Sequence, residues 1–253
     1  MNLKKYAIAL SMVAFASTAS AATIINGTAL QDGLDSLSQG GVFNQNVHTD
    51  QYSPAEVWTV DAVSTANAVM MFEFAGFATQ NTMGIYEIGN TSNKLELFDG
   101  PSAAGTTATL NIFGNFYQVV RFDPVTGITI GDTATINSSS FGFYLSTPQG
   151  NTFYSQASLN GDWDGDGKAD NHMVAYRGDG SLNMDANGDG TFRQFTSNNF
   201  ILAWEDLRLD VADRDYADMV VMVESFIPVP EPGTLALLGL GLLGLGAARR
   251  RKA

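Results

Sequence analysis

The sequence predicts an all-β body, folded as a single β-sandwich or jelly-roll-like domain over residues 23–227. Short runs rich in Val, Ile, Phe, Tyr and Trp, such as "SFGFYLST" and "DMVVMVESF", alternate with Gly, Asn, Asp, Ser and Pro. Aromatic residues make up 11% of the chain, enough to fill the space between two facing sheets. Between its two ends no segment sustains helical periodicity. No linker clearly divides the body, so one domain is the simplest interpretation, with a separate N-terminal subdomain as the alternative.

Residues 1–21 have the three parts of a secretory signal peptide. Lys4 and Lys5 form a positive start, an apolar run covers residues 6–15, and Ala19 and Ala21 supply the small residues needed for cleavage. The alternative is a buried N-terminal helix. We expect the leader to direct export and to be removed.

The other end of the chain predicts a short apolar helix over residues 234–248. It is followed by a basic tail at residues 249–252, which we expect to stay in the cytoplasm while the body lies outside. About 15 helical residues reach roughly 22 Å, which is short of the ~30 Å hydrocarbon layer. A temporary anchor in the inner membrane suits this helix better than a permanent one.

The order of these C-terminal features carries a family resemblance. Pro230, Glu231 and Pro232, a Gly/Leu-rich helix and an Arg-rich end resemble the PEP-CTERM sorting signal of Gram-negative bacteria, here over residues 228–253. The resemblance implies an exosortase-type transpeptidase as partner and cleavage near the tripeptide. It also implies delivery to the cell surface or extracellular matrix, in the company of exopolysaccharide and biofilm production. An ordinary C-terminal membrane anchor is the alternative.

The charge of the body indicates which partners it can have. The leader holds two of the 13 Lys and Arg and the tail holds four, which leaves seven; the tail holds one of the 26 Asp and Glu, so the body carries a net charge near −18. Such a surface excludes nucleic acid and anionic membranes as charge-driven partners and attracts cations. The chain has no Cys, so a bound metal is one available substitute for disulfides in an exported protein.

The stretch "DWDGDGKAD" predicts a calcium loop. Calcium takes six to eight hard oxygen ligands, and alternate carboxylates in a tight glycine-containing loop can point at one centre. Met173 stands where a helical EF-hand needs a bidentate Glu, so the loop resembles instead the β-hairpin calcium loops of integrin-type propellers. An unliganded acidic turn is the alternative. The predicted ligands are the side chains of Asp162, Asp164, Asp166 and Asp170 and the backbone carbonyl of Lys168.

A second acidic region also predicts metal binding. Its candidate ligands are Glu205, Asp206, Asp213, Asp215 and Asp218, and a structural ion-pair network with Arg208 and Arg214 is the alternative. A third stretch, "DANGDGTFR", places Arg193 in the closing position and is better explained as a turn.

The segments "EDL" and "DRDYADMVV" of this region resemble the domain of unknown function family 4114, found in bacterial surface and PEP-CTERM proteins. The resemblance is strongest over residues 70–226, although Ala217 stands where the family commonly has Asn. It implies an extracellular β-sandwich with calcium, and no established activity. A cation shared between this region and Asp170 would explain both acidic stretches.

Catalytic chemistry has few candidates. The chain has two His, His48 and His172, and no Cys, and it lacks the nucleophile and metalloprotease motifs. We therefore expect a non-catalytic structural or adhesive protein, in which Trp163 could contact extracellular polysaccharide. The alternative is a polysaccharide-acting enzyme that uses carboxylates of the second acidic region.

Overall fold

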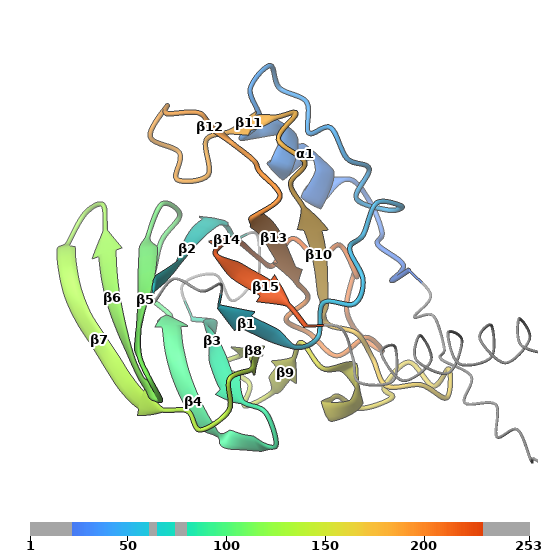
Figure 1. Ribbon diagram of the computed structural model, residues 1–253. Helices are drawn as coiled ribbons and strands as arrows, with labels where there is room; N and C mark the ends of the chain where they lie inside the picture. The colour runs from blue at the N-terminus through green and yellow to red at the C-terminus, as the bar shows by residue number, and fades with distance from the viewer. Residues whose placement is uncertain (1–21, 61–64, 74–79, 230–253) are drawn as a thin grey trace, which may run out of the picture. The chain divides into compact units, whose positions relative to one another are not determined.

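The computed structural model describes residues 22–60, 65–73 and 80–229 (Figure 1). The leader with its cleavage residues Ala19 and Ala21, the tripeptide Pro230–Glu231–Pro232 and the apolar helix 234–248 lie outside the described residues. None of the helices that are described combines the length and the apolarity needed to cross a membrane.

The predicted β-sandwich is confirmed, and its first layer is a six-stranded sheet. The strand order is β15–β1–β8–β3–β4, with β9 added beside β8. The strands are β1 (Trp58–Val60), β3 (Thr82–Glu87), β4 (Asn90–Phe98), β8 (Phe141–Ser146), β9 (Thr152–Tyr154) and β15 (Phe226–Pro228).

The second layer is a seven-stranded sheet with the order β10–β13–β14–β2–β5–β6–β7. Every pairing in the described part of both sheets is antiparallel. The strands are β2 (Thr65–Phe72), β5 (Thr107–Phe113), β6 (Phe116–Asp123), β7 (Gly127–Thr135), β10 (Met173–Arg177), β13 (Asn199–Trp204) and β14 (Met219–Glu224). A separate hairpin consists of β11 (Asn183–Met184) and β12 (Arg193–Gln194).

The main core lies between the two sheets. Alternate residues of the strands face inward, as the period of two in a β-strand requires; on β6, Tyr117 and Val119 are buried while Phe116 is exposed. The ring of Trp58 lies 5.5 Å from Phe143 of its own sheet and 5.1 Å from Phe200 of the other. These edge-to-face contacts join the layers at one position, where large aromatic rings contribute most of the buried area.

A second apolar cluster covers the outer face of the seven-stranded sheet. Every residue of β13 is buried, because its outward side chains pack against helix α1 (Ala29–Ser36) and the hairpin β11–β12, which lie together in Figure 1. The sequence pattern predicted no helix here. Gly33 interrupts the helical pattern of α1, and a Cβ at that position would lie 2.6 Å from the Phe72 ring, so close packing requires the glycine.

Candidate metal centre

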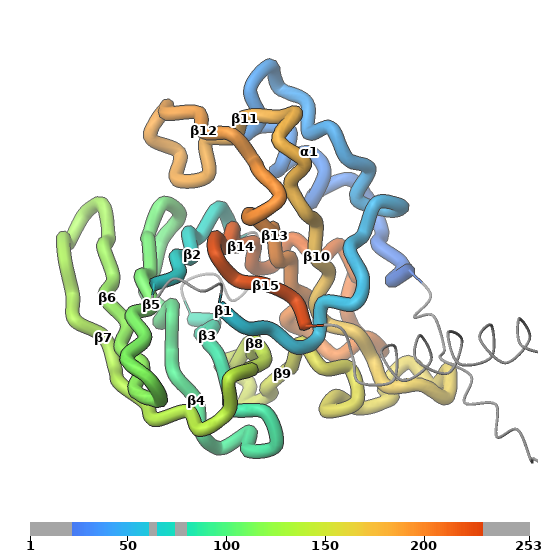
Figure 2. Tube along the Cα trace, viewed as in Figure 1, coloured from blue at the N-terminus to red at the C-terminus, as the bar shows by residue number. Residues whose placement is uncertain are grey.

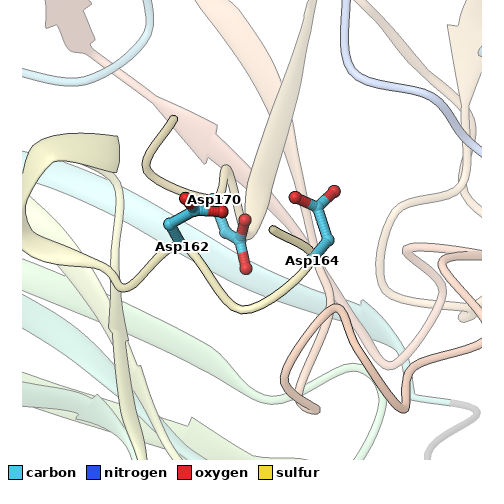
Figure 3. A group of neighbouring side chains, drawn as sticks. All are labelled: Asp162, Asp164 and Asp170. Carbon is cyan, nitrogen blue, oxygen red and sulfur yellow. The ribbon is translucent and has the colours of Figure 1, made fainter. Parts of the chain in front are cut away.

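The first acidic loop, residues 160–172, lies between the short 3₁₀ helix η1 (Ala157–Leu159) and β10. One side-chain oxygen each from Asp162, Asp164 and Asp170 lies within 4.8 Å of the others. Figure 3 shows the three carboxylates gathered on the turn of this loop. The structure therefore brings together three of the four predicted aspartates.

Backbone hydrogen bonds hold this loop in its turn. The carboxylate of Asp162 accepts the N–H groups of Gly165 at 2.9 Å and Gly167 at 3.0 Å, and both glycines have positive φ. Asp170 is buried and accepts the N–H of Trp163 at 3.0 Å. Burial raises the pKa of Asp170, and repulsion from Asp164 and Asp162 adds to the rise. The loop thus holds its carboxylates close together even though they repel one another.

Asp166 and Lys168 occupy the exposed side of the same loop. The carboxylate of Asp166 accepts the Lys168 N–H at 2.8 Å, and Asp166 is not part of the group of three. Their roles as ligands stay predictions.

The second acidic region lies where strands β13 and β14 end together. Because Trp204 pairs with Met219, the residues just beyond them, Glu205 and Asp218, meet at the same end of the sheet. One oxygen each from Glu205, Asp206 and Asp218 lies within 4.8 Å of the others, and Glu205 forms a second such group with Asp213 and Asp215. The five predicted residues of this region therefore form two groups that share Glu205.

The shared carboxylate is fully buried and short of partners. Glu205 is 0% exposed, and its Oε2 atom has no hydrogen-bond partner among the described residues. Burial, reinforced by the charge of Asp213, raises its pKa. Burial also raises the pKa of Asp218, with repulsion from Glu205 and Asp206 as the next causes. Such a set of acids is stable in ionised form only with a compensating positive charge.

An asparagine from the opposite sheet completes this region. Asn81 directly precedes β3; its Nδ2 donates to Asp206 at 2.8 Å, and its Oδ1 is buried without a hydrogen-bond partner. Asn81 was not predicted from the sequence, because a lone Asn before a strand is an ordinary turn residue. Its free amide oxygen is a ligand type that calcium accepts.

The loop between β13 and β14 contains two residues with left-handed backbone, Arg214 at φ 60° and Tyr216 at φ 55°. Non-glycine residues pay roughly 1–3 kcal/mol for such conformations, which persist where neighbouring contacts hold them. Here the Tyr216 hydroxyl donates to the Asn171 carbonyl, and the Arg214 carbonyl accepts the Asn26 N–H at 2.8 Å. The strain is therefore held by the neighbouring acidic loop and by the N-terminal segment.

The two acidic loops touch, but their carboxylates stay in separate groups. No group of three or more described acids combines them. Instead, the guanidinium of Arg214, from the second loop, lies 3.3 Å from the carboxylate of Asp164 in the first loop. The geometry favours separate cation sites over the single shared cation that the sequence suggested.

His172 is a structural histidine at this junction. It is 0% exposed, its ring stacks on Phe153 at 3.9 Å, and Nδ1 lies 3.2 Å from the Glu205 carbonyl. Burial lowers its pKa to about 4, so the ring is neutral at physiological pH. An N–H at Nδ1 donating to that carbonyl is the tautomer this contact requires.

Trp163 is less available to a sugar than the sequence suggested. Its ring lies 5.8 Å from Phe153 and 5.5 Å from His172, while the Arg208 guanidinium lies 5.8 Å from its centre. The ring is thus used to pack the acidic loop onto the body.

The residues present fit a hard divalent cation. The donors are carboxylate and amide oxygens, and oxygens spread over 4.8 Å can surround one ion at the 2.3–2.6 Å distances of calcium. Asp213 is exposed, so the group formed by Glu205, Asp213 and Asp215 extends to the surface of the protein.

These features define an all-β sandwich domain with oxygen-rich clusters at one end. Residues 129–225 match the family described as Domain of unknown function (DUF4114), a stretch that contains both acidic regions but not Asn81. Residues 228–252 match the PEP-CTERM protein-sorting motif, so the chain carries this sorting signal at its end. No curated protein and no solved structure matches the chain.

Proposed function

We propose that the protein is a non-catalytic module of the cell surface or extracellular matrix whose fold is stabilised by calcium. The PEP-CTERM motif indicates export, transient membrane anchoring through the C-terminal region and processing by an exosortase-type enzyme. The observation that supports calcium is the buried, unpartnered carboxylate oxygen of Glu205 inside a group of acids.

A cation at this position would join the two layers of the sandwich. Glu205 and Asp206 follow β13 and Asp218 precedes β14, both in the seven-stranded sheet, whereas Asn81 leads into β3 of the six-stranded sheet. A cation among them neutralises charges that would otherwise repel, and it replaces the cross-links that a chain with no Cys lacks.

A structural role fits the burial of the same groups. A general acid must reach the proton acceptor on its substrate, and Glu205 and His172 are both 0% exposed. Among the described residues, two cavities of about 100 and 400 Å³ are lined by residues outside both acidic regions. Extracellular polysaccharide remains the proposed neighbour of the module in the matrix, without an assigned contact residue.

Calcium binding is tested by isothermal titration together with thermal melting in chelator and in calcium. We expect tight binding and a rise in the melting temperature, since calcium at 100 times its dissociation constant stabilises a fold by about 2.7 kcal/mol. Identical melting curves in chelator and calcium would overturn the proposal.

Catalysis is tested separately, by incubating the protein with the polysaccharide of its own producer and assaying new reducing ends. We expect none. Release that disappears in Glu205→Gln would replace the structural role by an enzymatic one.

A further inference from the structure

The exposed apolar side chains of the described body are concentrated at one end of the seven-stranded sheet. Half of the large ones lie on β5, β6, β7 and their turns: Phe113, Phe116, Phe122, Val125, Ile128 and Ile130. Within this group, Phe122 pairs directly with Ile128 across the β6–β7 ladder, and Ile130 pairs with the half-buried Val120. These four side chains therefore form one continuous apolar strip on one face.

Among the described residues, strand β7 pairs on one side only, with β6. It is the last strand in the sheet order, and Figure 2 shows it as the outermost strand of this sheet. Its nine residues, GITIGDTAT, carry a single charge, Asp132, and neither Pro nor Lys, and its ladder with β6 is regular from Gly127 to Ile130, before a register shift. Natural proteins usually protect an edge with charges, Pro or a covering element, because its unpaired N–H and C=O groups recruit another strand.

We propose that a second copy of this chain pairs with β7 in antiparallel fashion, about a two-fold axis at Thr129. This register places Ile128 opposite Ile130 of the second copy, and Ile130 opposite its Ile128. The two apolar strips then join into one across the new ladder. The inference is independent of calcium, since β7 holds none of the candidate ligands.

The choice of register follows from the position of the one charge on the strand. An axis at Ile130 would put Asp132 opposite Ile128, and an axis at Gly131 would put it opposite Ile130. Only the axis at Thr129, among these three, matches apolar with apolar and leaves Asp132 beyond the isoleucine pairs. A copy of the same strand is thus complementary in both hydrogen bonding and side chains.

The size of the strip predicts an interaction that depends on concentration. Phe122, Ile128 and Ile130 are 51%, 74% and 71% exposed, which amounts to roughly 350 Å² of apolar surface per copy. Stable complexes bury about 800 Å² per partner, so a strip of this size predicts a weak, transient pair. Such a pair forms where copies are crowded, as on a membrane or in a matrix.

The absence of Cys from the chain allows a clean test by disulfide trapping in the producing cell. Thr129→Cys places two thiols across the axis, at the 4.5–5.5 Å Cα separation of opposed antiparallel residues, which a disulfide spans. Thr133→Cys is the matched control. Thr133 is also exposed on β7, but in this register Thr133 of one copy lies several residues along the ladder from Thr133 of the second copy. After mild oxidation, non-reducing gels should show at least tenfold more dimer for Thr129→Cys than for Thr133→Cys.

A second pair of variants tests the edge itself. Adding Ile130→Lys to Thr129→Cys should reduce the trapped dimer to about a tenth, since an edge lysine opposes strand pairing. Adding Val42→Lys, a change at another exposed valine, should leave it unchanged. Equal trapping at both cysteine positions, a monomer band alone, or cross-linked bands of another mass at Thr129→Cys would overturn the proposal.

Discussion

Replacing Glu205 by glutamine should change stability in opposite directions with and without calcium. Burial raises the Glu205 pKa from an ordinary 4.5 to about 7. A carboxyl with a raised folded-state pKa leaves the free energy of unfolding unchanged below about pH 4.5. Above about pH 7 it lowers that free energy by the full amount. For this shift the cost is about 3 kcal/mol.

Glutamine has the same shape as glutamate and carries no charge, so in chelator at about pH 8 it should recover most of that free energy. For a domain of this size, about 3 kcal/mol corresponds to a melting temperature roughly 5–10 °C higher. In calcium the order should reverse, because the variant has lost a charged ligand shared by both groups of the second acidic region.

Differential scanning calorimetry in chelator and in calcium measures both effects. Asp210→Asn is the matched control: Asp210 lies in the same loop, is exposed, and pairs with Arg208 rather than with the acidic groups. A lower melting temperature for Glu205→Gln than for the wild type in chelator would contradict this prediction, as would equal stabilisation of both proteins by calcium.

Three further changes test the rest of the site. Asp170→Asn should weaken calcium binding by the first loop about tenfold, measured by calorimetry, whereas Asp166→Asn should change it little because Asp166 is outside the group of three. Asn81→Ala should weaken calcium binding by the second region to a similar degree, by removing a neutral ligand from the opposite sheet. His172, with its pKa lowered to about 4, contributes stability that is complete above about pH 6.5 and lost as the pH falls towards 4, so His172→Phe should flatten the acid side of the stability curve.

Each of these has an outcome that contradicts it. Equal losses for Asp170→Asn and Asp166→Asn would mean that charge alone, not geometry, attracts the cation. Unchanged calcium affinity in Asn81→Ala would remove the proposed link between the sheets. An unaltered pH dependence in His172→Phe would show that other groups govern acid unfolding.

The sequence predicted the fold class and the acidic regions because both leave local patterns. Buried strands such as β13 read as apolar runs between turn residues, and the loop from Asp162 to Asp170 repeats Asp at alternate positions beside Gly. Glu205 and Asp218, thirteen positions apart, come together because β13 and β14 pair as neighbours, which two adjacent apolar runs already suggested.

Other features depended on contacts that no local pattern records. Asn81 joins the second acidic region only because it hydrogen-bonds to Asp206, which follows a strand of the opposite sheet. Strand β7 was missed because its Gly, Thr and Asp resemble a loop, and among the described residues it pairs with β6 alone. Helix α1 was missed because Gly33 interrupts its helical pattern. The glycine is explained by close packing against the Phe72 ring, a contact that the sequence does not reveal.

The outer apolar cluster has a consequence for the order in which the exported chain can fold. Its N-terminal part, with Leu30 and Leu34, emerges first, but it packs against residues of β10, β13 and β14. The Asn26 side chain donates to the Asp213 carbonyl, 187 positions later in the chain. This N-terminal part can therefore complete its packing only after almost the whole body has been exported. Until then, its leucines lack the apolar surface that later buries them.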